Sequence, residues 1–334
     1  MPRRPLLYLS AGDVAQALER VDVIEPVAAA LRAHAREQTI LPDEAHLAWE
    51  RGDEAARSLS MPGLLGSCPG VKIINANPAN PGRGLARASG LIVLLDIDSA
   101  EPTCILEAAR ISCLRTAAVT AIAAAALGAQ PIRRLALLGA GALARCHIEV
   151  LVQRLPELAE IRVYDRDPAR AAALAAEVPD QRIVICDSPE RAIRGAQLVI
   201  PLTTTRRGYI PPAWVDAGAL LVNVSLDDPL PDLVLEADKV FVDDLQIVAR
   251  DHRRLLGRML RAGQLRGPAD PPNSTSRAID GELGKLLIGS CAGRTRSDEI
   301  ILLNPFGLAI EDLALARRVH QHALDHALGT TLAR

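Results

Sequence analysis

A glycine-rich turn between an apolar strand and a helix constrains the fold of this chain more than any other sequence feature. Residues 139–144 read Gly-Ala-Gly-Ala-Leu-Ala, a GxGxxA pattern that follows the apolar segment RLALL and precedes the helix-forming segment LARCHIEVL. Asp165 stands at the end of the next predicted strand. This order is typical of a Rossmann unit, whose glycines let the backbone approach a pyrophosphate at the helix N-terminus. A tight strand-to-helix turn in another kind of α/β protein is the alternative.

The same segment predicts the cofactor. Asp165 is expected to accept hydrogen bonds from both ribose hydroxyls and to repel a 2′-phosphate, which favours NAD over NADP. Arg166 and Arg170 weaken this preference, because an arginine can accommodate that phosphate. The turn residues expected to contact the dinucleotide are Gly139, Ala140, Gly141, Ala142 and Leu143.

Strand and helix signals alternate from residue 132 onward, which predicts right-handed crossovers and a mostly parallel sheet. The predicted strands are 134–138, 161–164, 183–185, 198–200, 220–224 and 240–242. The N-terminal part mixes both types: a helix starting at 10–13, a strand 58–61 ending in a Pro62-Gly63 turn, strands 71–75 and 90–96, and a helix 107–127. Gly128 ends that helix and marks the predicted domain boundary. A last amphipathic helix covers 308–328.

Composition excludes several classes of protein. The net charge is -2 and only 2% of residues are aromatic, which argues against nucleic acid as a partner. The longest apolar stretch, residues 117–127, is shorter than the about 20 residues that span a bilayer. The first residues lack the apolar core of a signal peptide. We therefore predict a cytoplasmic protein with reduced cysteines and no membrane or metal partner.

Cationic residues in the first third of the chain are candidate ligands for an anion. Lys72, Arg87 and Arg115 stand out, and Arg115 lies inside an alanine-rich helix where an unpaired guanidinium would be costly. We expect Arg115 to meet an anion, either a ligand or an internal acid. Glu107 and Asp96 are the candidate internal acids.

Two further groups are candidates for chemistry. Asp227 and Asp228 follow a predicted parallel strand, where ligands bind and a carboxylate can act as general base. Taken alone, a helix N-cap or a turn ahead of Pro229 is the simpler interpretation of these residues. His322 and His326 have i, i+4 spacing, but without a third ligand a solvated helix face is the simpler interpretation.

Five separated motifs are spread over nearly the whole chain. They are Ser60-Met61-Pro62, Lys72 with Asn77-Pro78-Ala79-Asn80, Ser112-Cys113-Leu114-Arg115-Thr116-Ala117-Ala118, the glycine-rich turn, and Gly307-Leu308-Ala309-Ile310-Glu311-Asp312. Together they resemble the ornithine cyclodeaminase/mu-crystallin family. The resemblance implies a Rossmann domain, residues 128–303, and an α+β substrate and dimerisation domain, residues 1–127 with 304–334. It also implies a homodimer.

Within the family, three stretches look most similar to the branch that makes 2,3-diaminopropionate for siderophores and antibiotics. They are residues 87–90, 222–244 and 298–314. The reaction implied is an NAD-dependent oxidative hydrolysis of N-(2-amino-2-carboxyethyl)-L-glutamate to 2-oxoglutarate and L-2,3-diaminopropionate. Two alternatives remain: a cyclodeaminase that turns ornithine into proline and ammonia with internally recycled NAD, and an imine reductase or NAD(P)H-binding protein like mu-crystallin.

The resemblance implies roles for single residues. Lys72, Arg87 and Arg115 match positions that hold substrate carboxylates, and Thr116 matches a cofactor position. His46 stands near where many relatives carry an arginine.

The acid pair is assigned in the same way. Asp228 matches the acid of the diaminopropionate branch and is preferred as proton acceptor, with Asp227 as the reserve. Lys72 is a further catalytic candidate, because its amine could polarise the imine or the water. Asp227 stands where a basic residue is expected in that branch.

Overall fold

The computed structural model describes residues 5–52, 54–178, 180–271 and 276–333 and divides into two compact units. Unit 1 comprises Met1–Arg115 and Leu308–Arg334, and unit 2 comprises Thr116–Gly307. The first division falls inside helix α3 (Ala109–Leu127) rather than at its end, which differs from the boundary predicted at residue 128. The second falls after Gly307 rather than before residue 304. The first turns of α3 belong to unit 1 because Arg115 pairs with acids on the last helix of that unit.

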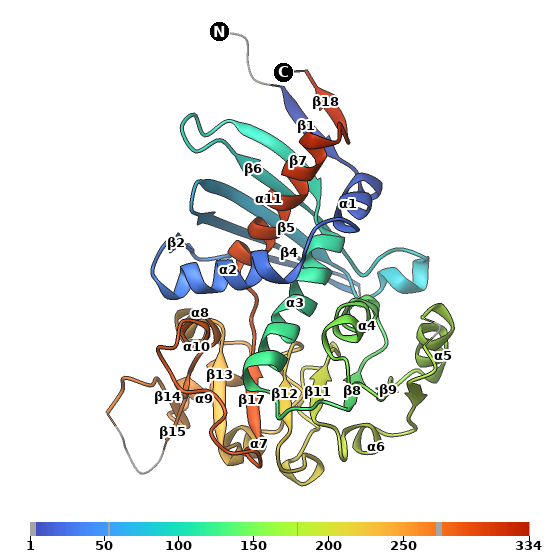
Figure 1. Cartoon of the computed structure of the whole chain (residues 1–334), viewed down its shortest axis with the longest axis vertical. Coiled ribbons are helices and arrows are strands. Elements are labelled where there is room, and N and C mark those ends of the chain that lie inside the picture. The colour runs from blue at the N-terminus through green and yellow to red at the C-terminus, as the bar shows by residue number, and fades with distance from the viewer. Residues whose placement is uncertain (1–4, 53, 179, 272–275, 334) are drawn as a thin grey trace. The chain divides into compact units, whose positions relative to one another are not determined.

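Unit 1 is built on an eight-stranded sheet in the order β18-β1-β7-β6-β5-β4-β2, with β3 also paired to β4. Helix α11 (Ala309–Asp325) contacts β4, β5 and β6 and packs against α1 and α2, as Figure 1 shows. The other elements are α1 (Ala11–Leu18), α2 (Ile24–Ala35), η1 (Asn80–Arg83), β1 (Leu6–Leu9), β2 (Thr39–Ile40), β3 (Ala45–Arg51), β4 (Glu54–Leu65), β5 (Cys68–Ala76), β6 (Ala88–Leu95), β7 (Pro102–Glu107) and β18 (Thr330–Leu332).

The strand predicted to end at Pro62 continues through it. On one edge, β4 pairs with β3 over residues 54–60 and with β2 over residues 64–65. Pro62 lies in the interval that neither strand covers, which is a position where a proline is tolerated in a sheet. The predicted turn at Pro62-Gly63 is therefore wrong.

Unit 2 is a doubly wound α/β domain, which confirms the predicted fold class. The eight strands of its main sheet are all parallel in the order β10-β9-β8-β11-β12-β17-β13-β16, so the order reverses between β8 and β11. The strands are β8 (Arg134–Leu138), β9 (Glu160–Tyr164), β10 (Ile183–Ile185), β11 (Leu198–Pro201), β12 (Leu220–Val222), β13 (Lys239–Val242), β16 (Gly281–Glu282) and β17 (Ile301–Asn304). The helices are α4 (Ala142–Arg154), α5 (Pro168–Glu177), α6 (Pro189–Ile193), η2 (Pro212–Trp214), α7 (Pro231–Glu236), α8 (Leu245–Arg250), α9 (Leu255–Arg261) and α10 (Leu283–Leu287); β14 (Leu265–Arg266) pairs with β15 (Arg277–Ala278).

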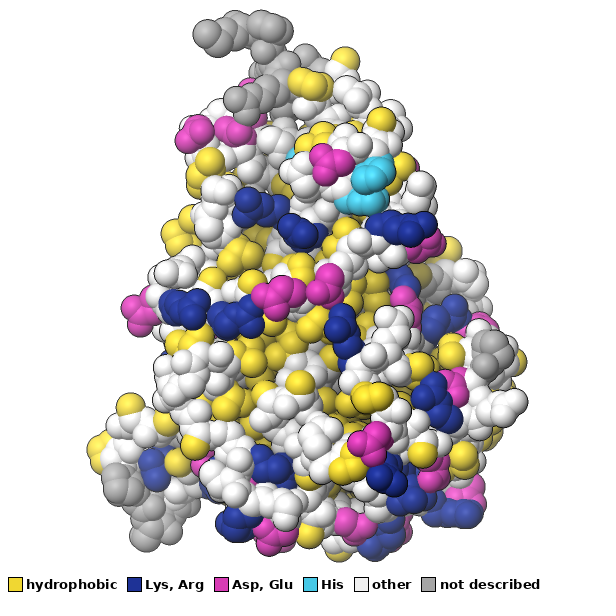
Figure 2. Space-filling model, viewed as in Figure 1, with side chains coloured by type: hydrophobic (Ala, Val, Ile, Leu, Met, Phe, Trp, Pro, Cys, Tyr) yellow, Lys and Arg dark blue, Asp and Glu magenta, His cyan; other side chains and the backbone are white. Residues whose placement is uncertain are grey.

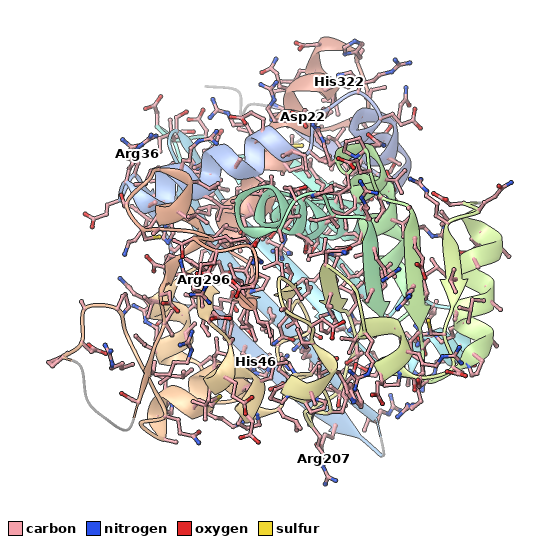
Figure 3. All side chains as sticks on the ribbon, turned by 60° about the horizontal axis from the view of Figure 1, so that its bottom comes forward. Asp22, Arg36, His46, Arg207, Arg296 and His322 are labelled. Carbon is pink, nitrogen blue, oxygen red and sulfur yellow. The ribbon has the colours of Figure 1, made fainter. Side chains whose placement is uncertain are left out.

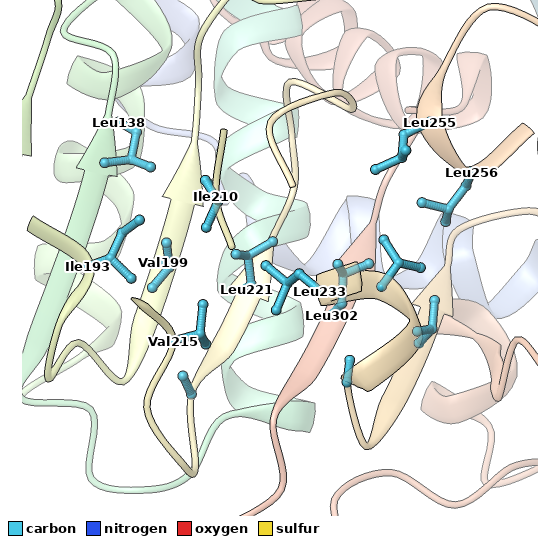
Figure 4. Packing of buried hydrophobic residues seen from close by; sticks show 14 of the residues in the cluster. Leu138, Ile193, Val199, Ile210, Val215, Leu221, Leu233, Leu255, Leu256 and Leu302 are labelled. Carbon is cyan, nitrogen blue, oxygen red and sulfur yellow. The ribbon is translucent and has the colours of Figure 1, made fainter. Parts of the chain in front are cut away.

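The core of unit 2 is an aliphatic layer against this sheet, shown in Figure 4. Val199 and Leu221 from the central strands are fully or almost fully buried, and Leu233 and Leu256 from the helices pack with them. Burial on this scale stabilises a side chain by roughly 1.5–3 kcal/mol each. Continuous apolar strands were readable in the sequence because both faces of a parallel sheet are covered.

Helix α3 is long and apolar enough to cross a membrane by length and composition, but most of its apolar window is buried inside the protein. A buried core helix meets the same criterion. Within unit 2, Thr120 of α3 lies 3.0 Å from Nε2 of His147 on α4, and both side chains are fully buried. His147 Nδ1 lies 2.7 Å from the Leu143 carbonyl oxygen. Burial lowers the pKa of His147 to about 4, so the ring is neutral at pH 7.

The cysteines depart in part from the prediction of reduced thiols. Cys68, Cys104, Cys186 and Cys291 are free, whereas Cys113 and Cys146 are disulfide-bonded. The surface agrees with the small net charge, because basic and acidic side chains are interspersed on the face that Figure 2 shows.

Candidate functional site

The glycine-rich turn connects β8 to α4 at the carboxyl edge of the unit 2 sheet. Gly139 has φ 108°, and a Cβ placed there would lie 2.9 Å from the carbonyl oxygen of Leu202, so this position requires glycine. The Ala140 N–H donates to Asp165 Oδ2 at 2.8 Å. Arg170 places a guanidinium nitrogen 3.4 Å from where a Cβ of Gly141 would be. The open backbone, the helix N-terminus and the acid after β9 together fit a dinucleotide.

Asp228 is a fully buried carboxylate held by three hydroxyl groups. Thr203 Oγ1 donates to Oδ1 at 2.7 Å, Tyr209 Oη donates to the same oxygen at 3.1 Å, and Ser225 Oγ donates to Oδ2. Burial raises the pKa of Asp228, and the three hydroxyl donors oppose that rise. The arrangement leaves an oriented carboxyl group that is more basic than an exposed aspartate.

Asp227 occupies a different environment from its neighbour. Its Oδ1 accepts the Leu255 N–H at 2.9 Å and lies 3.3 Å from an Arg258 nitrogen, and its Oδ2 pairs with Arg254 at 2.9 Å. Both oxygens are therefore engaged at the start of α9. This geometry favours Asp228 over Asp227 as a group that exchanges protons.

In unit 1, Lys72 is buried within an ion-pair network. Its Nζ donates to Ser112 Oγ and to Asp312 Oδ1, each at 2.8 Å, which accounts for two of three N–H bonds. Burial lowers the pKa of Lys72 to about 8, and the charge of Asp312 opposes that shift. Lys72 can therefore change its charge near neutral pH.

Arg115 belongs to the same network. Its guanidinium donates to Glu311 Oε2 at 2.8 Å and approaches Asp312 Oδ2 at 3.3 Å. Internal acids thus contact Arg115, and they include Glu311 and Asp312 of the last helix rather than the expected Glu107. With two cations and two carboxylates the network is close to neutral.

Strand register shows which other residues share the sheet face of Lys72. Lys72 is opposite Met61, and in β4 the alternate residues Leu59 and Arg57 point to the same face. His46 is opposite Leu59, so it shares this face on β3. Figure 3 labels His46 among the side chains. Arg57 is half-buried. It is a cation of this face that sequence reasoning missed, although it lies just before the Met-Pro pair.

The remaining predicted residues lie at defined places. Arg87 comes directly before β6, and its carbonyl oxygen accepts the Asn77 N–H at 2.9 Å. Thr116 follows Arg115 on α3. His322 of α11 and His326, the residue directly after that helix, stack with ring centroids 4.0 Å apart. Among the described residues, no group of three or more His, Cys, Asp or Glu side chains could hold a metal ion.

Sequence reasoning also missed the groups that orient the candidates. Thr203, Tyr209 and Ser225 on Asp228 come from three segments, and only Ser225 is close to it in sequence. Glu311 and Asp312 were part of a quoted motif but had no role. Their position could have indicated a role, because two acids within an apolar helix need cationic or hydrogen-bonding partners once they are buried.

Known proteins resemble this chain over nearly its whole length. The model of the ornithine cyclodeaminase/mu-crystallin family matches residues 7–327. N-((2S)-2-amino-2-carboxyethyl)-L-glutamate dehydrogenase of Staphylococcus aureus is 31% identical over 98% of each chain. The crystal structure of a protein named CmnK is 36% identical, with a TM-score of 0.91 over 99% of this chain and 98% of that one. An archaeal alanine dehydrogenase dimer with bound NAD has the same fold, with 23% identity and a TM-score of 0.85 over 98% of this chain and 99% of that one.

Proposed function

The chain belongs to the ornithine cyclodeaminase/mu-crystallin family, and from this premise we propose that it is the NAD-dependent dehydrogenase of N-(2-amino-2-carboxyethyl)-L-glutamate. The reaction oxidises the secondary amine to an imine at the glutamate α-carbon. Water adds to the C=N bond, the C–N bond breaks, and 2-oxoglutarate and L-2,3-diaminopropionate leave. The diaminopropionate would serve as a precursor of siderophores or antibiotics, made in the cytoplasm.

NAD supplies the hydride acceptor of this reaction. The residues proposed to hold it are the backbone of the turn from Gly139 to Leu143, Thr116, and Asp165 toward the ribose hydroxyls. Arg166 and Arg170 are exposed beside this acid and would contact the adenosine end. The support is the glycine-requiring turn at a helix N-terminus and the NAD-bound relative of the same fold.

Asp228 is the proposed proton acceptor. A general base works best when its pKa is near the operating pH, and burial moves the pKa of Asp228 in that direction. Thr203, Tyr209 and Ser225 fix its orientation. Asp228 would take a proton from the amine and release it to solvent. It would then take a proton from the attacking water and return it to the nitrogen as the C–N bond breaks, while Asp227 anchors α9.

The basic side chains of unit 1 support the choice of substrate, because Arg87 and Arg57 add positive charge beyond the near-neutral network of Lys72 and Arg115 with their two acids. The proposed substrate has three carboxylates, whereas ornithine has one. Lys72 and Arg57 share a sheet face. Ala76 pairs with Arg57 on one side and with Ala88 on the other, and Arg87 directly precedes Ala88 in the chain. Arg115 is oriented by Glu311 and Asp312. We assign the carboxylates to Lys72, Arg87 and Arg115, with Arg57 and His46 as further cations on the face of Lys72.

A homodimer is part of the proposal. Ile73, Leu91, Leu47 and Trp49 lie on the sheet face opposite to Lys72, because their positions alternate with those that face α11. All four are at least 36% exposed. Several exposed apolar side chains on one sheet face are typical of an interaction site, and the NAD-bound relative is itself a dimer. A second copy of the chain is the proposed occupant.

The deciding assay supplies N-(2-amino-2-carboxyethyl)-L-glutamate and NAD and follows NADH absorbance together with 2-oxoglutarate. We expect equal amounts of NADH and 2-oxoglutarate. A cyclodeaminase would instead release ammonia from ornithine without net NADH, so an ammonia assay runs in parallel. Ammonia without NADH, or no reaction with the secondary amine at saturating NAD, would reject the proposal.

A further inference from the structure

Two asparagines at the carboxyl edge of the unit 2 sheet have amide groups that the protein does not fully satisfy. Asn223 directly follows β12, and Asn304 is the last residue of the neighbouring strand β17. Both side chains are fully buried, and Asn223 Nδ2 donates to Asn304 Oδ1 at 2.7 Å. Among the described residues, Asn223 Oδ1 and Asn304 Nδ2 have no hydrogen-bond partner.

Such groups call for an explanation, because a buried amide atom without a partner costs about 1–3 kcal/mol. Exchanging O and N in both amides reverses the direction of their shared hydrogen bond. The pair still presents one free acceptor and one free donor. The complement is therefore a group that donates one N–H and accepts one hydrogen bond on adjacent atoms, as a primary carboxamide does.

The pair is joined to the predicted cofactor site by contacts within unit 2. The backbone of Gly139 packs closely against the carbonyl of Leu202. Thr203, the residue after Leu202, donates a hydrogen bond to Asp228. The Asn223 carbonyl accepts the Leu226 N–H at 3.2 Å in the turn that leads to Asp228. Leu226 has φ 77°, a conformation that a leucine rarely adopts. The carboxyl ends of the adjacent strands β8, β11, β12 and β17 thus form one continuous edge.

We propose that Asn223 and Asn304 bind the carboxamide of the nicotinamide, with Asn223 Oδ1 accepting its N–H and Asn304 Nδ2 donating to its carbonyl oxygen. This inference rests on the proposed function, since it assumes a nicotinamide dinucleotide. It gives the pair a recognition role: a dinucleotide whose ring carries no amide N–H should bind more weakly.

The test is equilibrium binding to the full-length protein by calorimetry with three probes. They are NADH, the reduced 3-acetylpyridine analogue, which keeps the carbonyl but lacks the N–H, and ADP-ribose, which lacks the ring. We expect the wild type to bind NADH about tenfold more tightly than the analogue, as for one hydrogen bond. In the Asn223→Leu/Asn304→Leu double variant, that preference should vanish, while ADP-ribose affinity stays unchanged.

Several outcomes would overturn the proposal. One is a double variant that binds ADP-ribose and NADH as the wild type does, which is the result expected if a buried water satisfies the amides. Another is an equal loss for all three probes, which would show a structural role. Asn304→Asp keeps the size of the side chain and should weaken NADH and the analogue alike; unchanged affinity would contradict the assignment even if the double variant does not fold. Failure of the wild type to bind any probe would instead reject the dinucleotide function itself.

Discussion

Asp227 and Asp228 are adjacent in the chain, yet their surroundings suit Asp228 to proton transfer and Asp227 to a structural role. Asp228 is held by neutral hydroxyl donors, and Asp227 is paired with two arginines and a helix N-terminus. Hydroxyl donors orient a carboxylate without neutralising its charge, whereas the arginines beside Asp227 engage both of its oxygens in ion pairs. Substitution of Asp228 should therefore change mainly the reaction rate, and substitution of Asp227 mainly the stability of the fold.

Replacing each aspartate by asparagine separates these roles. Asp228→Asn should lower kcat by roughly 10²–10⁴-fold, as expected for loss of a general base, with little change in stability or NADH binding. Asp227→Asn should lower the free energy of unfolding by about 1–3 kcal/mol through weaker pairing with Arg254 and Arg258, with a smaller effect on kcat. Kinetics and chemical denaturation measure both. Equal losses of kcat in the two variants would contradict the assignment.

The lowered pKa of Lys72 predicts that kcat/KM falls at alkaline pH. Because burial lowers the pKa of Lys72 to about 8, its charged form dominates below that pH and disappears above it. If this charge binds a substrate carboxylate, kcat/KM should fall about tenfold per pH unit above pH 8. Lys72→Arg should remove the fall, since a guanidinium stays charged. Lys285→Arg, at an exposed lysine, is the control, and a fall that persists in Lys72→Arg would disprove the role.

At the scale of elements, the buried contact between α3 and α4 makes stability depend on pH. The pKa of His147 is about 4 in the folded protein and near 6.5 when unfolded, so the unfolded chain binds more protons between these values. This contribution to stability is complete above pH 6.5 and is lost as the pH falls toward 4. Its size is about 3 kcal/mol.

The variant His147→Leu removes this dependence. Asp243, whose pKa burial raises to about 6, has the opposite slope, so the quantity to compare is wild type minus variant. That difference in unfolding free energy should become smaller, by about 3 kcal/mol, between pH 7 and pH 4. The control is His252→Leu at an exposed histidine. Parallel pH profiles for wild type and His147→Leu would show that the ring is not buried neutral.

Elements also show where sequence reasoning succeeds. The strands around the glycine-rich turn were predictable because each is short, apolar and covered on both faces. Strand β17 was missed, since it is separated from its partners β12 and β13 by long stretches of chain and only tertiary pairing places it there. The helix predicted from residue 10 is divided into α1 and α2, although its start at the Ser10–Asp13 capping box was correct.

The candidate site, like the fold, was predictable from the sequence only in part. The cations and the acid pair could be picked by residue type and motif, but the groups that orient them could not. Arg115 meets Glu311 across 196 residues of sequence, and Tyr209 meets Asp228 from another loop. No local periodicity encodes such contacts, because they arise only when distant strands and helices pack together.

For the whole molecule, the apolar face of the unit 1 sheet predicts the oligomeric state. Leu91→Glu should convert a dimer to a monomer, because burying an unpaired carboxylate in that interface is costly. Light scattering after size-exclusion chromatography measures the mass. Ile185→Glu, at an exposed apolar site of unit 2, is the matched control and should stay dimeric. A monomeric wild type, or an unchanged mass for Leu91→Glu, would place the interface elsewhere.

The central claim is that a hydride leaves the glutamate α-carbon of a tricarboxylate amine, and isotope transfer tests it most directly. N-(2-amino-2-carboxyethyl)-L-glutamate carrying deuterium at that carbon is incubated with the protein and NAD, and the NADH formed is analysed by mass spectrometry. The account predicts one deuterium in each NADH, with unlabelled 2-oxoglutarate and diaminopropionate. Unlabelled NADH, or deuterium that stays on the carbon while the substrate is consumed, would contradict it.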